Sequence, residues 1–266
     1  MAKFIRKGSK KAGQVPGTPV YVGEEREAAV TVSRFDYDEA DVRRDVLDSV
    51  EEVASSLATT RNSWINVDGV HDVEKIQRIG ACFKLHPLVI EDIVHTGQRP
   101  KVEDYDSLLF IVLRMLRWNG DSEEIDDEQV SIALGPSWVL SFQERQGDVF
   151  DPVRERILSN RGRVRKLGSD YLAYALIDAV VDHYFTILEA LGERIEALGE
   201  DMTENPKREL LFMRKSVWPL REVLGNIQRD EASLLGNRPV HTSEMSTTTR
   251  SRSLTPSRRF ATWSPV

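Results

Sequence analysis

The chain has 266 residues, a formal net charge of −7 and 40% hydrophobic residues, which fits one large domain or two small ones with a substantial core. Its single cysteine, Cys82, excludes an internal disulfide and a thiolate metal cluster, and we expect it in the core. No run of eighteen apolar residues and no signal-peptide core occur in the printed sequence, so we expect a soluble cytoplasmic chain without a transmembrane helix.

Charge is distributed unevenly along the chain. Residues 1–23 hold five Lys or Arg and no acid, and residues 236–266 hold five Arg against one Glu. The body between these termini has 26 basic and 42 acidic residues, a net charge of −16, which repels nucleic acid and attracts cations. The composition of residues 1–23 is typical of a mobile basic arm, and a tether to a membrane or to nucleic acid is the alternative.

Strands and helices are predicted to alternate in the first third of the chain. Residues 30–35 alternate as a strand, residues 38–57 predict a helix with acidic residues in its first turn, and residues 64–67 predict a short buried strand. His71-Asp72 can cap the next helix, which has apolar residues at helical spacing at Val73, Ile76, Ile79 and Phe83.

Residues 85–116 predict a helix, a turn and a strand. Pro87 is permitted in a first helical turn, and the apolar side of the helix consists of Leu88, Ile90, Ile93 and Val94. We therefore expect the adjacent carboxylates Glu91 and Asp92 to point away from the core. The strand at residues 109–113 is too apolar to lie at the edge of a sheet.

A hairpin is predicted next. It follows an acidic connector at residues 121–128, and its strands are residues 130–134 and 138–142. Strands mixed with helices at this spacing favour an α/β/α layered sandwich with a mixed sheet over residues 24–168.

Two long helices are predicted from residue 169 onward. In the first helix apolar residues step by four and three, as in the a/d seam of a coiled coil, at Ile177, Val181, Tyr184, Leu188, Leu191, Ile195 and Leu198. Asn205-Pro206 can start a second helix, which repeats the pattern from Leu210 to Ile227. We expect residues 169–235 to form a long antiparallel helical hairpin with a dry seam, followed by the start of a stalk.

Several motifs resemble those of one family of transporters. The motifs are residues 86–116, WINVDG before them, and EQVSIAL, GDVFDPVRERI, DYLAYALIDAVVDHYF and RKSVWPLREVL after them. In this order they are similar to the cytosolic domain of CorA-type magnesium and cobalt transporters. The resemblance implies a divalent-cation-sensing regulatory domain on the cytoplasmic side of the inner membrane, and a homopentamer in the full-length family. It implies membrane attachment only through a transmembrane part that the printed residues do not include.

Four carboxylates are candidate ligands of Mg²⁺, and of Co²⁺ as a second ion. Mg²⁺ prefers oxygen ligands and needs few carboxylates, which suits the pair Glu91 and Asp92; Asp178 and Asp182 lie one helical turn apart. Without the resemblance, both pairs are better explained as solvated helix faces. The resemblance implies that Glu91, Asp92 and Asp178 match cation sites between neighbouring subunits. It implies nothing for His183, whose imidazole Co²⁺ would tolerate.

The sequence contains no pattern typical of an enzyme: no nucleophile elbow, no phosphate-binding loop and no paired histidines. One alternative is a soluble coiled-coil scaffold whose carboxylates bind no specific metal. Another is a nucleic-acid protein that uses its basic termini, although the acidic body argues against nucleic acid as a partner.

Residues 236–266 are typical of a disordered tail, with twelve Ser or Thr and one Leu. They begin where the stalk of the family would continue. The codons of residues 244–265 can also be read in a shifted frame, in which the last base of each codon is joined to the first two bases of the next. This frame can encode DVYDHTIQVLDAVETFRDMVS, which resembles that stalk. We therefore expect a tail from a shifted reading frame that starts near Leu235, with incomplete cation sites as a result.

Overall fold

The centre of the structure, a computed structural model, is a seven-stranded sheet in the order β2-β1-β3-β7-β6-β5-β4. The structure describes residues 13–198 apart from 14, 24, 25, 59, 106 and 121–123; the predicted second helix and the tail lie outside this range. The strands are β1 (Thr31–Tyr37), β2 (Val42–Leu47), β3 (Asn62–Asp68), β4 (Lys101–Tyr105), β5 (Leu108–Asn119), β6 (Glu124–Leu134) and β7 (Trp138–Gln143). β3 and β7 are parallel and the other neighbours antiparallel, which confirms the mixed sheet.

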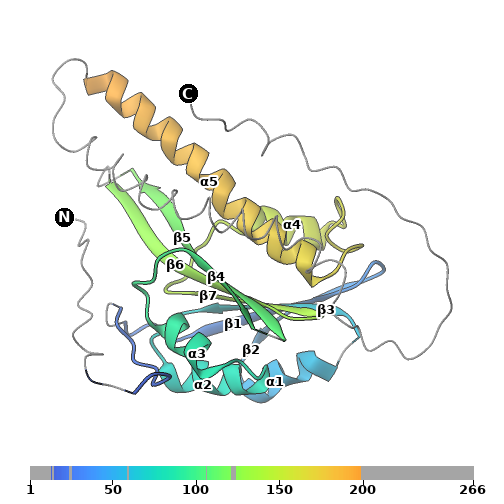
Figure 1. The fold of residues 1–266 in the computed structure, drawn as a ribbon. Helices are drawn as coiled ribbons and strands as arrows, with labels where there is room; N and C mark the ends of the chain where they lie inside the picture. The colour runs from blue at the N-terminus through green and yellow to red at the C-terminus, as the bar shows by residue number, and fades with distance from the viewer. Residues whose placement is uncertain are drawn as a thin grey trace.

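Helices cover both faces of this sheet (Figure 1). One layer holds the short helices α1 (Val50–Ser55), η2 (Ser56–Ala58), α2 (Val73–Cys82) and α3 (Pro87–Val94). The opposite layer holds α4 (Asp151–Leu158) and α5 (Ser169–Leu198). The α/β/α sandwich predicted from the sequence is therefore confirmed.

Each face of the sheet has its own apolar core, because successive side chains of a strand point to opposite faces. On β3, Trp64 packs in the cluster that includes α4 and α5, and Ile65 packs in the cluster that includes α2 and α3. The Trp64 ring stacks on Phe35 at 5.2 Å between centroids, and its indole N–H donates to the Ser141 hydroxyl at 2.9 Å. This indole anchors three neighbouring strands to one another.

The helix predicted for residues 38–57 is wrong in its first half. Residues 42–47 form the edge strand β2, which pairs with β1, and the helix is confined to Val50–Ser55. The Asp38 carboxylate accepts the N–H groups of Ala40 and Asp41, which closes a tight turn instead of starting a helix. Ser49 provides the actual cap, since its hydroxyl accepts the N–H of Glu52 at 3.2 Å.

The acidic connector predicted at residues 121–128 is also too long. β6 begins at Glu124, and its acidic residues face arginines of β5 and of the segment after β7. Glu128 is buried and pairs with Arg117 at 2.5 Å and with Arg145 at 3.2 Å. These ion pairs let a strongly acidic segment continue the sheet.

Helix α5 packs on the sheet through a stripe that coincides only in part with the predicted seam, of which Ile177, Tyr184 and Leu191 are buried. Its buried residues recur at helical spacing and include Leu172, Leu176, Val180, Tyr184, Ile187 and Leu191. The predicted seam position Leu188 is 39% exposed, so the expectation that it is buried is wrong. Within the described residues, one stretch, Ser169–Glu193, is long and apolar enough to cross a membrane, and 44% of the apolar window within it is buried inside the domain.

Candidate metal site

Helix α3 carries the first predicted pair of carboxylates. The helix begins after His86, whose ring nitrogen accepts the N–H of Leu88 at 3.2 Å, and Pro87 occupies its first turn. The imidazole of His86 also stacks on Tyr105 of β4, with 5.4 Å between ring centroids. This contact fixes the start of α3 above the edge strand.

Glu91 is almost completely buried, with 7% of its surface exposed. Its Oε2 accepts the backbone N–H of Gly17 at 2.5 Å, and five residues later the N–H of the buried Val22 donates to the carbonyl of Val94. Residues 15–23 therefore lie along α3, which differs from the mobile arm predicted for residues 1–23. The expectation that Glu91 points to solvent is wrong, because this segment covers it.

Asp92 is nearer the surface and has two side-chain partners, one neutral and one charged. Its Oδ1 accepts an N–H of the Gln98 amide at 2.5 Å, and its Oδ2 accepts the ammonium of Lys101 at 2.6 Å. The same ammonium donates to Oε1 of Glu103 at 2.8 Å. Burial acts to lower the pKa of Lys101, but its hydrogen bonds to Asp92 and Glu103 outweigh burial and hold that pKa above its ordinary value.

The chain of polar contacts continues along the edge strand β4. The hydroxyl of Tyr105 donates to Oε2 of Glu103 at 3.1 Å. Burial, and after it the charge of Glu103, raises the pKa of Tyr105 to about 12, so this hydroxyl stays a donor at neutral pH. Asp92, Lys101 and Glu103 thus form an ordered carboxylate–ammonium–carboxylate row.

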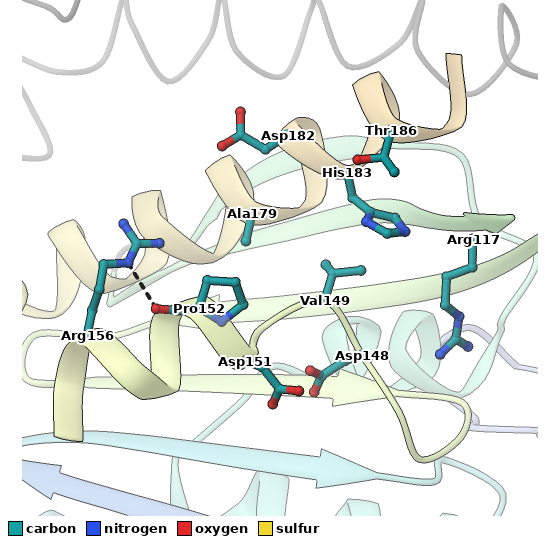
Figure 2. A pocket seen from close by; sticks show the side chains of 10 residues that line it. All are labelled: Arg117, Asp148, Val149, Asp151, Pro152, Arg156, Ala179, Asp182, His183 and Thr186. Carbon is teal, nitrogen blue, oxygen red and sulfur yellow. Dashed lines mark hydrogen bonds between the residues drawn. The ribbon is translucent and has the colours of Figure 1, made fainter. Parts of the chain in front are cut away.

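The second predicted pair lies on α5. Asp178 is half-buried and Asp182 is exposed. Asp182 lies at the rim of an open groove of about 420 Å³ between α4 and α5. Figure 2 shows Asp182 turned outward, whereas His183 points toward the sheet on the side of Arg117. Burial, and then the charge of Arg117, lowers the pKa of His183, so its imidazole is neutral at pH 7.

The structure does not bring the two predicted pairs together. Glu91 and Asp92 belong to the layer of α1–α3, while Asp178 and Asp182 belong to the α4–α5 layer on the other side of the sheet (Figure 1). Among the described residues no group of three or more His, Cys, Asp or Glu could hold a metal ion. Mg²⁺ takes six oxygen ligands and keeps several waters, so either pair needs ligands from outside the described part of one chain, or water.

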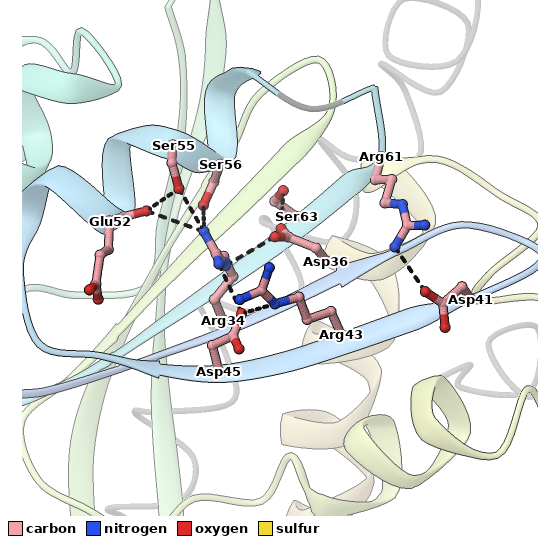
Figure 3. A network of polar contacts seen from close by, with 10 residues as sticks. All are labelled: Arg34, Asp36, Asp41, Arg43, Asp45, Glu52, Ser55, Ser56, Arg61 and Ser63. Atoms are coloured by element: carbon pink, nitrogen blue, oxygen red, sulfur yellow. Dashed lines mark hydrogen bonds and ion pairs between the residues drawn. The ribbon is translucent and has the colours of Figure 1, made fainter.

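A buried charged network around Arg34 could not be found from the sequence (Figure 3). The Arg34 guanidinium lies 3.0 Å from Asp36 and 2.8 Å from Asp45, and it donates to the Ser55 hydroxyl at 2.9 Å. It therefore links β1, β2 and α1. A single arginine in an alternating strand gives no signal for this role, because its partners come from two other elements.

A second missed cluster lies where the parallel strands β3 and β7 end. Burial, and then the charge of Asp148, raises the pKa of Asp68 to about 6. Asp148 is also buried, but two hydrogen bonds from Arg154, together with those of Phe150 and Gln143, hold the pKa of its carboxyl below the ordinary value. Two neighbouring carboxylates are thus shifted in opposite directions.

The fold is that of the soluble domain of a class of metal transporters. A ZntB cytoplasmic domain from Vibrio parahaemolyticus has a TM-score of 0.60 at 12% identity, covering 78% of this chain and 83% of that chain. The soluble domain of CorA from Methanocaldococcus jannaschii has a TM-score of 0.51 at 17% identity, and the match covers 80% of this chain and 82% of that chain. At these identities the likeness shows the fold alone.

Sequence comparison gives the family. The model of the CorA-like Mg²⁺ transporter protein family matches residues 59–246. The cobalt/magnesium transport protein CorA of Thermotoga maritima is 43% identical over 243 residues, 87% of this chain and 69% of that protein. A putative metal ion transporter of Bacillus subtilis is 27% identical over 175 residues, 62% of this chain and 53% of that protein. The chain belongs to the CorA-like Mg²⁺ transporter family.

Proposed function

We propose that this chain is the cytosolic divalent-cation-sensing part of a CorA-type magnesium and cobalt transporter or channel. The observation that carries the proposal is the division of its carboxylates between two layers. Asp92 on α3 and Asp178 on α5 lie on opposite sides of one sheet, so each needs further ligands. A neighbouring subunit supplies them if α3 of one copy faces α5 of the next. The 43% identity to a cobalt/magnesium transport protein supports a role in the transport of these ions.

Electrostatics gives such an assembly its response to cations. The acidic body of the chain, with a net charge of −16 between the basic termini, repels a second copy of itself. Divalent ions between facing carboxylates screen this repulsion and bridge the copies. In a homopentamer, bound Mg²⁺ would favour the closed pore and its loss would let the subunits move apart.

Thermal unfolding in the presence of cations tests this proposal. A ligand that binds only the folded protein stabilises it by about 2.7 kcal/mol at a hundredfold excess over its Kd. We expect Mg²⁺ or Co²⁺ to raise the melting temperature above that in sodium at equal ionic strength, and Asp92→Ala to reduce the increase. Glu155→Ala is the matched control, because Glu155 is an exposed acid on the opposite layer. An equal increase in wild type and Asp92→Ala would refute the role of Asp92.

The alternative of a coiled-coil scaffold has one observation in its favour. Helix α5 exposes three large apolar side chains on the face away from the sheet, Tyr174, Phe185 and Leu188. A scaffold would assemble through such a face without regard to magnesium. Light scattering of the purified chain with and without Mg²⁺ separates the two functions, since only the sensor predicts a change in mass.

A further inference from the structure

The ammonium of Lys101 occupies the position next to Asp92 that a metal ion would need. Its Nζ lies 2.6 Å from Oδ2 of Asp92 and 2.8 Å from Oε1 of Glu103, both within the range of strong charge-assisted hydrogen bonds. The other carboxylate oxygen of Asp92 is bound by the neutral amide of Gln98. Asp92 is therefore already neutralised by a cation that belongs to the chain itself.

We infer that Lys101 is a tethered cation that competes with divalent ions for Asp92 and thereby sets the affinity of that site. The inference rests on the proposed function, because it assumes that Asp92 takes part in cation binding. It adds a residue, Lys101, that opposes binding, and a second one, Glu103, that holds the lysine when it has left Asp92.

Three features of the contact support an exchange. The Lys101 side chain is 28% exposed and has four rotatable bonds, so its ammonium can move toward solvent. Glu103 is 37% exposed and keeps an oxygen 2.8 Å from the ammonium, which offers Lys101 a partner after displacement. The Gln98 amide remains on Oδ1 and continues to orient the Asp92 carboxylate toward an incoming ion.

Glu91 differs from Asp92 in this respect. Its carboxylate accepts a backbone N–H of Gly17 and is nearly inaccessible. The competition therefore acts at Asp92, the member of the pair that solvent reaches.

Removing the ammonium tests the inference. A single positive charge about 4 Å from a divalent ion opposes binding by roughly thirtyfold in affinity, even with the dielectric constant of water. We expect Lys101→Met to lower the Kd for Mg²⁺ by roughly this factor in calorimetric titrations at constant ionic strength. Lys166→Met is the control, because it removes the same charge from an exposed lysine of the connection between α4 and α5, 3.8 Å from Glu39.

The outcomes separate the inference from the proposed function. If wild type does not bind Mg²⁺ at all, the proposed function fails. If wild type binds and Lys101→Met binds equally or more weakly, the competition is refuted, since a purely structural lysine gives that result. If Lys101→Met binds Mg²⁺ more tightly than wild type and Lys166→Met binds it equally, the competition is supported. Lys101→Gln replaces Lys101→Met if the latter does not fold.

A measurement on the unmodified protein provides the reciprocal test. An ammonium held between two carboxylates reacts slowly with an acetylating reagent, and a displaced lysine reacts faster. We expect the acetylation rate of Lys101, followed by mass spectrometry, to rise when Mg²⁺ is added, and that of Lys166 to stay constant. A Lys101 rate that does not change while Mg²⁺ binds would contradict the exchange.

Discussion

Replacing Asp68 with asparagine should stabilise this protein, although it removes a charge from a network of ion pairs. The pKa of Asp68 is raised from 3.8 to about 6 by burial and by the neighbouring charge of Asp148. Arg154 and the amide of Asn66 favour the ionised form, but they do not compensate. Each pH unit of displacement corresponds to 1.36 kcal/mol, and because Asp68 is partly exposed we expect a penalty of about 1–2 kcal/mol rather than the full amount.

The sign of the pH dependence follows from proton binding. Between about pH 4 and pH 6 the folded protein binds more protons at Asp68 than the unfolded chain does, so stability falls as the pH rises through this range. Above this range the whole penalty is present, and below it the penalty disappears. Asp68→Asn does not ionise, so it should gain about 1–2 kcal/mol at pH 7.5 and close to nothing at pH 4.

Urea denaturation of wild type and Asp68→Asn at these two pH values measures the difference. Asp148→Asn is a control of opposite sign, because the pKa of Asp148 is held below its ordinary value and its loss leaves Arg154 without its bidentate partner. It should destabilise the protein at pH 7.5. An Asp68→Asn variant that is less stable than wild type at pH 7.5, or a gain that is the same at both pH values, would refute the reasoning.

Three further predictions follow from burial, charge and reading frame. Leu191→Ala, at 1% exposure, should cost about 2–5 kcal/mol of unfolding free energy, and Leu188→Ala, at 39% exposure on the same helix, less than about 1 kcal/mol; equal losses would show that the stripe is misassigned. Arg34→Leu should cost about 3–5 kcal/mol in urea denaturation, because it leaves the buried Asp36 without its guanidinium, and a loss below about 1 kcal/mol would contradict the network. Sequencing the coding DNA around Leu235 tests the shifted frame, which codon third bases incompatible with the alternative reading would exclude.

Elements specified by local signals were predicted correctly. The hairpin of β6 and β7 has its turn at Gly135-Pro136, and α2 has both an Asp72 cap and apolar residues at helical spacing. Residues 42–47 lack such a signal: their alternation is weak, and they form a strand because β1 provides a partner for pairing. Their conformation depends on the sheet, so a local pattern favoured the wrong element.

The sequence placed Glu91 and Asp92 on one helix but did not indicate their environment. The resemblance indicated Glu91 and Asp92, and α3 carries both. Which of the two would be buried could not be predicted, because the eight-residue helix is apolar on more than one side and Glu91 is covered by Gly17, 74 residues earlier. The role of Lys101 depends on the position of an edge strand that the sequence did not indicate.

Both α3 carboxylates have partners within the chain, and this changes how a cation response is explained. Bare carboxylates on an acidic body would attract any cation at low concentration. In the proposed exchange, a divalent ion replaces the Lys101 ammonium at Asp92. The ion must therefore bind this carboxylate more strongly than the ammonium does, and its affinity would be lowered by the energy of the Lys101 contact. An ion of higher charge, bridging to a second subunit, meets this requirement where sodium does not. A threshold set by Lys101 would make the site responsive over a chosen concentration range instead of permanently occupied.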